Sequence, residues 1–213
     1  MGRSSYHRRR LSRLDLKPIN IGMKLVYIHG ANATSESFNY IRSKVGEGTD
    51  INYDSRNGFE NNLKDMLEQL KYIKDIAFVA HSLGGIYALH IANAIPKQVL
   101  GAVTISTPYG GAEVADYAQY FLPFSRLMRD IGPSSWVMRQ SDCIKIKHPW
   151  TNIVTMRGQS PFIVEPNDGV VTISSMRHHA DMELVEVNYN HYEVVLSESV
   201  IKIIQERIKK FKK

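Results

Sequence analysis

Short apolar runs alternate with longer amphipathic stretches along most of the chain. Buried parallel strands read as nearly continuous apolar runs, and the amphipathic stretches between them fit crossover helices. The pattern therefore predicts an α/β fold with a mostly parallel sheet and helices on both of its faces. The predicted strands are residues 24–29, 49–53, 75–80, 99–106, 152–157 and 182–188, and the predicted helices are residues 36–45, 60–72, 83–94 and 196–211.

Residues 108–150 interrupt this alternation and form the longest irregular stretch of the chain. Prolines and glycines recur through the stretch, and an apolar run lies between Val114 and Met128. Such residues break regular elements, so the stretch is expected to be a small insert that resembles a lid or cap. The remaining length fits one domain over residues 23–213, because 213 residues with 43% hydrophobic content can bury one core.

The net charge of +6 is concentrated in the first 22 residues. That tail holds six basic residues against Asp15, which leaves the body of the chain almost neutral. A basic tail can bind phosphates or anionic lipid, but it is more often a solvated arm. We therefore expect residues 1–22 to be a flexible arm that makes at most a weak contact with a membrane surface, and we expect no specific nucleic-acid partner.

Cysteine content and hydropathy bear on the location of the protein. Cys143 is the one cysteine in the chain, so no internal disulfide can form. The tail lacks the apolar core of a secretory signal, and the chain has no apolar run long enough to cross a bilayer. These features predict a cytoplasmic protein, which we expect to be a monomer.

The sequence AHSLGG, residues 80–85, is the first candidate for chemistry. It follows an apolar strand and precedes a helix, so Ser82 falls at a sharp strand–turn–helix junction. The small residues Ala80 and Gly84 let the strand and the helix approach each other. The amide of Leu83 then lies at a helix N-terminus, which favours an anion. A serine that merely caps the helix is the alternative, but the context favours a nucleophile.

A second segment, HGANAT at residues 29–34, follows the first strand. Gly30 permits a turn that directs the next amide into the cleft, so the Ala31 N–H is a candidate oxyanion donor together with the Leu83 N–H. His29 itself is expected to hold the loop in place.

A serine nucleophile needs a histidine to take its proton and a carboxylate to orient that histidine. Where the serine lies at such a junction, the acid and then the histidine follow it along the chain. Asp168 in NDGVV and His191 in NYNH occupy these places, after a late strand and after the last strand. Glu165 is the rival acid. The other histidines are expected in packed, loop or surface positions, without the spacing of a metal site.

The segments HGANATS, AHSLGG, STPYGG, NDGVV and NYNH together resemble the lipase and esterase branch of the α/β-hydrolase superfamily. The resemblance is to small bacterial lipases and related serine esterases, and it covers about residues 23–210. It implies an α/β-hydrolase fold with a six-stranded sheet in the order 2-1-3-4-5-6. It also implies Ser82, Asp168 and His191 as the catalytic residues, Ala31 and Leu83 as oxyanion donors, and no cofactor.

The same resemblance implies a carboxylic ester as the substrate, either a small molecule or a lipid. The alternatives are a thioesterase, an amidase or a peptidase on the same fold, and a binding module that docks through its basic tail. Apolar residues of the insert fit either an acyl groove or ordinary core packing. Candidate substrate contacts are His81, for which a packed role is the alternative, and Tyr109, Tyr117, Phe121 and Phe124.

Overall fold

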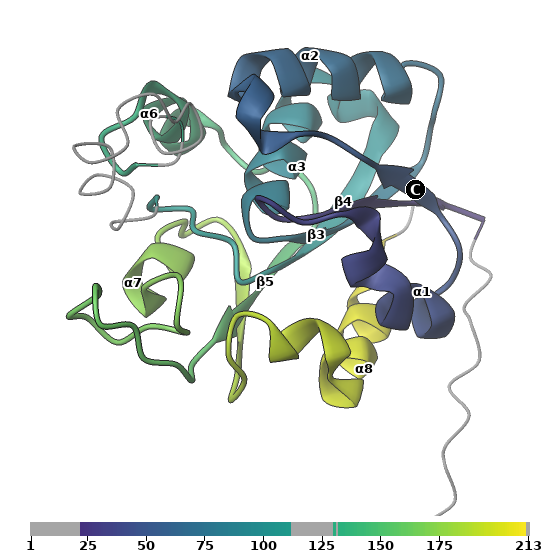
Figure 1. The fold of residues 1–213 in the computed structure, drawn as a ribbon. Helices are drawn as coiled ribbons and strands as arrows, with labels where there is room; N and C mark the ends of the chain where they lie inside the picture. The colour runs from purple at the N-terminus through teal and green to yellow at the C-terminus, as the bar shows by residue number, and fades with distance from the viewer. Residues whose placement is uncertain (1–21, 112–129, 131, 212–213) are drawn as a thin grey trace, which may run out of the picture.

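The computed structural model describes residues 22–111, 130 and 132–211 of the chain. These residues form a six-stranded sheet in the order β2-β1-β3-β4-β5-β6, in which every neighbouring pair is parallel (Figure 1). The order confirms the one that the family resemblance implies. The strands are β1 (Lys24–Ile28), β2 (Thr49–Ile51), β3 (Ile76–His81), β4 (Val99–Ile105), β5 (Trp150–Thr155) and β6 (Glu183–Val187).

Helices cover both faces of the sheet. One face packs against α2 (Phe59–Leu70) and α3 (Leu83–Ala94), with α6 (Trp136–Cys143) beside them. The other face packs against α1 (Asn39–Val45) and α8 (Glu198–Ile208). Figure 1 shows these two layers above and below the sheet, with the short helix α7 (Ile173–Met176) near one end. None of the helices within the described ranges is long and apolar enough to cross a membrane.

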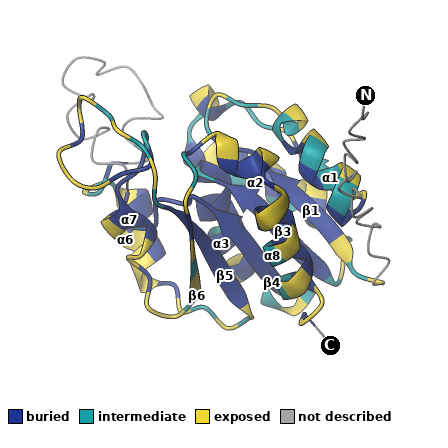
Figure 2. Ribbon diagram, turned by 90° about the horizontal axis from the view of Figure 1, so that it is seen from below, coloured by how far each residue is buried: buried dark blue, intermediate teal, exposed yellow. Residues whose placement is uncertain are grey.

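The central strands lie between two apolar layers. All six residues of β3 are buried, and its side chains alternate between the layers: Ala77 and Val79 contact the α1/α8 layer, whereas Phe78 contacts the α2/α3 layer. Figure 2 shows the middle of the sheet in dark blue between helices whose outer faces are yellow. Burial on both faces explains why these strands read as continuous apolar runs rather than as alternating ones.

The insert, residues 108–150, contains a regular helix where the sequence predicts irregular structure. Helix α6 lies within residues 108–150, and its Val137 and Met138 belong to the core on the α2/α3 side. The sequence did not predict this helix because only part of one face is apolar and it lies between prolines. Strand β5 begins at Trp150, two residues earlier than predicted, and the last helix begins at Glu198 after a 3₁₀ turn, Glu193–Leu196, rather than at residue 196.

The beginning of α3 passes very close to β1. A Cβ atom added at Gly84 would lie 2.2 Å from the carbonyl oxygen of Ile28 and 2.6 Å from that of His29. Real Cβ atoms do not approach backbone oxygen so closely, so only glycine allows the helix to start here. This contact holds the turn at Ser82 against the loop that follows β1.

Replacing Gly84 with alanine is therefore expected to lower the free energy of unfolding by about 1–3 kcal/mol, because strand and helix must separate. Urea denaturation measures the loss. Asn93→Ala is the matched control, since Asn93 is an exposed residue of the same helix, and it should change stability by less than about 0.5 kcal/mol. Equal stabilities of Gly84→Ala and the unaltered protein would contradict the close approach.

Candidate active site

Ser82 lies at the junction between β3 and α3 in a strained backbone conformation. Its φ of 54° and ψ of −126° are far from the extended angles of an ordinary helix N-cap, and its side chain makes no capping hydrogen bond. Such a conformation costs about 1–3 kcal/mol and persists only where the surroundings impose it. Here the Ser82 N–H donates to Ile105 O at 2.8 Å and the Gly85 N–H donates to Ser82 O at 2.9 Å. The geometry is that of a positioned serine and not of a helix cap.

The loop after β1 lies directly beside this serine. A Cβ atom at Gly30 would be 3.1 Å from the Cβ atom of Ser82, so the two backbones are in contact. The Nδ1–H of His29 donates to Gly30 O at 2.8 Å, and the His29 ring stacks on Tyr53 at 4.4 Å between centroids. Tyr53 in turn donates from its hydroxyl to His29 O at 2.9 Å. His29 thus holds the loop, the role expected from the sequence.

These contacts bear on the two oxyanion donors. In a trans peptide the C=O and N–H groups point in opposite directions. Because Gly30 O points to the His29 ring, the N–H of Ala31 in the same peptide points away from that ring. Leu83 is the first residue of α3, so its N–H has no acceptor within the helix. Leu83 follows Ser82 directly, and Ala31 follows Gly30, whose backbone is in contact with Ser82.

His191 and Asp168 form a buried pair at the same edge of the sheet. His191 Nδ1 lies 2.8 Å from Asp168 Oδ2, and the two side chains are 4% and 0% exposed. A carboxylate can only accept, so Nδ1 carries the hydrogen and Nε2 of the neutral ring is free of one. An imidazole in this tautomer is a base at Nε2. The His191 N–H also donates to Asp168 O at 3.1 Å, which fixes the two loops to each other.

The turn at Asp168 presents its carboxylate to several donors. Oδ1 accepts the N–H groups of Val170 at 3.0 Å and Val171 at 2.8 Å, and Oδ2 accepts from the Thr155 hydroxyl as well as from His191. Burial raises the pKa of Asp168, but the hydrogen bonds from His191, Thr155 and Val171 outweigh it and hold the pKa below its usual value. The acid is therefore ionised at neutral pH and can stabilise a charged imidazolium.

His81 connects the turn at Ser82 with the base. Its Nε2 lies 3.0 Å from the carbonyl oxygen of His191, and the two rings are 4.8 Å apart between centroids. Because a carbonyl only accepts, Nε2 of His81 carries the hydrogen. Burial, and next the positive charge that His191 can carry, lower the pKa of His81 to about 3. His81 is only 7% exposed. It therefore occupies a packed position, which is the alternative that the sequence offered to a substrate contact.

The rival residues lie elsewhere. Glu165 is exposed and accepts from the Ser174 hydroxyl at 2.7 Å. His178 pairs with Asp142 on the surface, and His179 is buried against Ser141 O. The structure brings Asp168, and not Glu165, to His191. Across the residues that the structure describes, no group of His, Cys, Asp or Glu gathers as a metal site would require.

The structure describes one of the four candidate substrate contacts that the sequence places in the insert. Tyr109 is fully buried, and its hydroxyl lies between Thr104 Oγ1 at 3.0 Å and the Trp150 indole nitrogen at 2.8 Å. That places Tyr109 in the core rather than at a surface that a substrate could reach. Tyr117, Phe121 and Phe124 lie outside the described residues.

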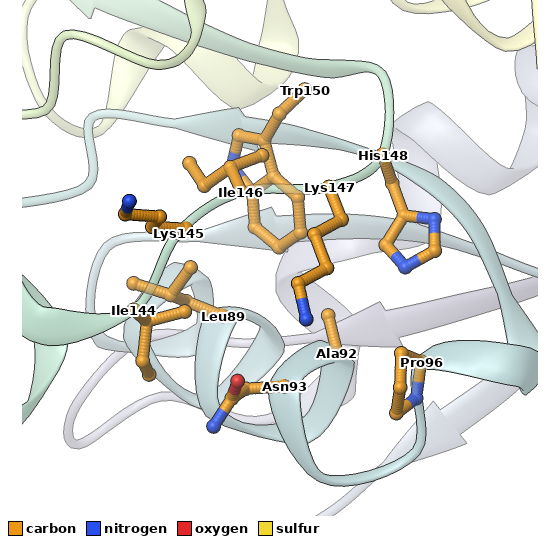
Figure 3. A pocket seen from close by; sticks show the side chains of 10 residues that line it. All are labelled: Leu89, Ala92, Asn93, Pro96, Ile144, Lys145, Ile146, Lys147, His148 and Trp150. Atoms are coloured by element: carbon orange, nitrogen blue, oxygen red, sulfur yellow. The ribbon is translucent and has the colours of Figure 1, made fainter.

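A small apolar hollow lies at the opposite edge of the sheet. Figure 3 shows the residues that line this hollow. Leu89 belongs to α3, whereas Ile144 and Trp150 belong to the segment that leads into β5. Trp150 opens β5, whereas Ser82 and Asp168 follow the carboxyl ends of their strands. The hollow is therefore separate from the Ser82 site. Open α/β sheets bind their ligands at the carboxyl edge, where the candidate residues gather.

Comparison with known proteins agrees with this geometry. The model of the "Alpha/beta hydrolase family" matches residues 25–180. The chain belongs to the alpha/beta hydrolase family. No curated protein matches it in sequence.

Solved structures of this family share the fold at low identity. The mature Bacillus licheniformis lipase BlEst2 is 14% identical with a TM-score of 0.69, over 90% of this chain and 94% of the lipase. The metagenomic carboxyl esterase MGS0156 is 13% identical with a TM-score of 0.65, over 91% and 75% of the two chains. RedJ, a thioesterase from the prodiginine pathway of Streptomyces coelicolor, is 12% identical with a TM-score of 0.57, over 98% and 99%. At these identities the likeness shows the fold.

Two histidines, the buried His81 and the half-buried His90, predict a dependence of stability on pH. Burial lowers the pKa of His90 to about 4 and contributes most to the value of about 3 for His81, both below the unfolded value of 6.5. The unfolded chain therefore binds more protons than the native one in this range. The contribution of these two histidines to stability is therefore expected to be complete above about pH 6.5 and to be lost as the pH falls towards about 4.

Urea denaturation measures this loss when it is repeated at steps of about one pH unit between pH 7 and pH 4. His90→Gln has no ring to protonate and keeps a side-chain amide near the Ser141 hydroxyl, which lies 2.9 Å from His90 Nε2. Its free energy of unfolding should fall less steeply with acid than that of the unaltered protein. Identical slopes would show that the fold does not hold His90 in its neutral form.

Proposed function

We propose that the chain is a serine hydrolase that cleaves carboxylic esters through an acyl-enzyme on Ser82. In this reaction Nε2 of His191 takes the Ser82 proton while Oγ attacks the ester carbonyl. The amides of Ala31 and Leu83 stabilise the oxyanion, and His191 then protonates the leaving alcohol. In the second half, His191 activates a water that releases the acid and regenerates Ser82. The reaction needs no cofactor.

The buried His191–Asp168 pair is the observation that carries this proposal. It fixes the tautomer that a general base requires, and His81 holds it beside the strained turn of Ser82. A helix cap or a structural histidine would need neither the strain at Ser82 nor an ionised acid in the core. Fold likeness to a lipase and a carboxyl esterase supports an ester as the substrate.

A thioester is the second candidate substrate. Fold likeness to two thioesterase structures, RedJ and the Vlm2 thioesterase domain, favours it. The same serine, histidine and aspartate would serve, because the acyl-enzyme is the same and only the leaving group differs. We place the ester first because the segments around Ser82, Asp168 and His191 resemble lipases and esterases.

Hydrolysis of a substrate panel tests the proposal. The panel holds aryl and alkyl esters of increasing acyl length, a matched thioester and a matched amide, each assayed with the unaltered protein and with Ser82→Ala. We expect ester turnover that depends on acyl length and is absent in Ser82→Ala. Turnover of the thioester or the amide without that of the esters would replace the proposed substrate, and ester turnover that survives in Ser82→Ala would overturn the mechanism.

A further inference from the structure

We propose that Thr155, supported by Ser106, is a positioning residue that sets the pH at which His191 becomes a base. The inference rests on the proposed function, because it concerns the same histidine and acid. Thr155 is the last residue of β5, and Ser106 follows the last residue of β4. Neither residue has any exposed surface.

The hydroxyl of Thr155 lies against the acid. Its Oγ1 is 2.5 Å from Asp168 Oδ2, the same oxygen that accepts the Nδ1–H of His191 at 2.8 Å. Ser106 Oγ is 2.9 Å from Thr155 Oγ1 on the other side. A row of polar groups therefore runs from Ser106 through Thr155 and Asp168 to His191, all inside the protein.

Counting hydrogens gives this row a direction. Thr155 has one hydroxyl hydrogen, and the ionised carboxylate of Asp168 can only accept. Thr155 therefore donates to Asp168, and the hydroxyl of Ser106 donates to Thr155. Each bond polarises the next in a buried site, so Ser106 strengthens the donor that Thr155 presents to the acid.

The backbone around Ser106 favours this role. Ser106 has a φ of 51°, a left-handed conformation uncommon for a residue other than glycine, and its N–H donates to Ile153 O at 2.9 Å. The strained turn directs its hydroxyl at the end of the neighbouring strand β5. The chain thus has strained serines after two adjacent strands: Ser82 after β3 and Ser106 after β4.

The donor from Thr155 competes with His191 for the negative charge on Oδ2. While Thr155 donates, part of the charge of Asp168 is neutralised by the hydroxyl, so the carboxylate holds the imidazolium less strongly. Without that donor, Oδ2 attracts the His191 proton more strongly. His191 then loses its proton only at a higher pH, and the serine is activated over a narrower range.

Other titratable groups face this pair from the neighbouring elements. His81 on β3 and His29 after β1 lie on the side of the serine, and Tyr192 packs edge-on to His191 at 5.4 Å between ring centroids. Arg157 and Glu193 pair with each other at the surface. The Thr155 hydroxyl is bonded to Ser106, Asp168 and the Met176 sulfur and not to these groups, so the effect of its removal is expected to act through the acid.

The variants Thr155→Val and Thr155→Ser separate the hydroxyl from the shape of the side chain. In Thr155→Val we expect the acid limb of the kcat/KM profile to move up by about one pH unit, so that kcat/KM on the acid side of the limb is about ten-fold lower. Thr155→Ser keeps the donor and should restore both values. Thr151→Val is the matched control on the same strand. The Thr151 hydroxyl lies 3.0 Å from Glu183 Oε2, and its removal should leave the profile unchanged.

A second measurement does not depend on turnover. The Nδ1–H proton of His191 can be followed by proton NMR in the resting protein, and its titration midpoint should rise in Thr155→Val and rise less in Ser106→Ala. If Thr155→Val does not fold, Ser106→Ala decides the question by the same measurement. A risen midpoint without ester turnover would support the Thr155 role and count against the proposed function. Unshifted midpoints in the folded variants would overturn the role of Thr155 whether or not the protein hydrolyses esters.

Discussion

Ser82→Ala is expected to lower kcat for an ester about 10⁶-fold, to the level left by the oxyanion donors and substrate binding alone. The hydroxyl is the atom that forms the acyl-enzyme, and none of the neighbouring groups can replace it. Ser82 makes no capping hydrogen bond, so its removal should leave α3 intact and the melting temperature nearly unchanged. Initial rates with a chromogenic ester, together with thermal unfolding, measure both quantities.

Ser43→Ala is the matched control for this variant. Ser43 is an exposed residue of α1 whose hydroxyl donates to Tyr40 O at 2.7 Å, far from the carboxyl edge of β3. It should keep full activity. A loss of activity in Ser43→Ala as large as that in Ser82→Ala would show that the assay reports folding and not the nucleophile.

Asp168→Asn is expected to lower kcat about 10⁴-fold. The carboxylate accepts the Nδ1–H of His191 and so leaves Nε2 free to take the Ser82 proton. An amide nitrogen at the same place can donate to Nδ1, which moves the ring hydrogen to Nε2 and removes the base. The loss of charge also removes the stabilisation of the imidazolium. Steady-state kinetics at neutral pH give the ratio of kcat values.

Glu165→Gln is the control that distinguishes the two acids of this loop. Glu165 is exposed and bonded to Ser174, so its charge should not matter to His191. We expect kcat to remain within about two-fold of the unaltered protein, as for an ordinary surface substitution. A large loss in Glu165→Gln with little loss in Asp168→Asn would exchange the roles of the two residues.

Much of the fold could be predicted from the sequence because its central strands are buried on both faces. β3 is predicted almost to the residue, and α3 from Leu83 to Ala94 is predicted with both ends correct. The start of β5 was missed because Trp150 is fixed by a tertiary contact, the bond from its indole to the Tyr109 hydroxyl. Helix α6 was missed for a similar reason, since Val137 and Met138 meet a core that local periodicity does not reveal.

The site was predictable where chemistry dictates chain order. Ser82, Asp168 and His191 each follow a strand, and parallel strands bring their carboxyl ends to one edge. Thr155 and Ser106 were not predicted, because their hydroxyls meet only when β4 and β5 pair, with Ile105 opposite Ile153. The signal was present as hydroxyl residues at the ends of two apolar strands. A polar side chain at the end of a buried strand must find a partner, but the sequence does not say which one.

Reaction with a fluorophosphonate tests the central claim most directly, because this reagent phosphonylates only a serine that a base activates. The folded protein should gain one adduct by intact mass, and peptide mapping should place it on Ser82. Asp168→Asn should react far more slowly, whereas Glu165→Gln should react at the normal rate. Folded protein that gains no adduct, or that gains it on another serine, would contradict the assignment of Ser82 as the nucleophile.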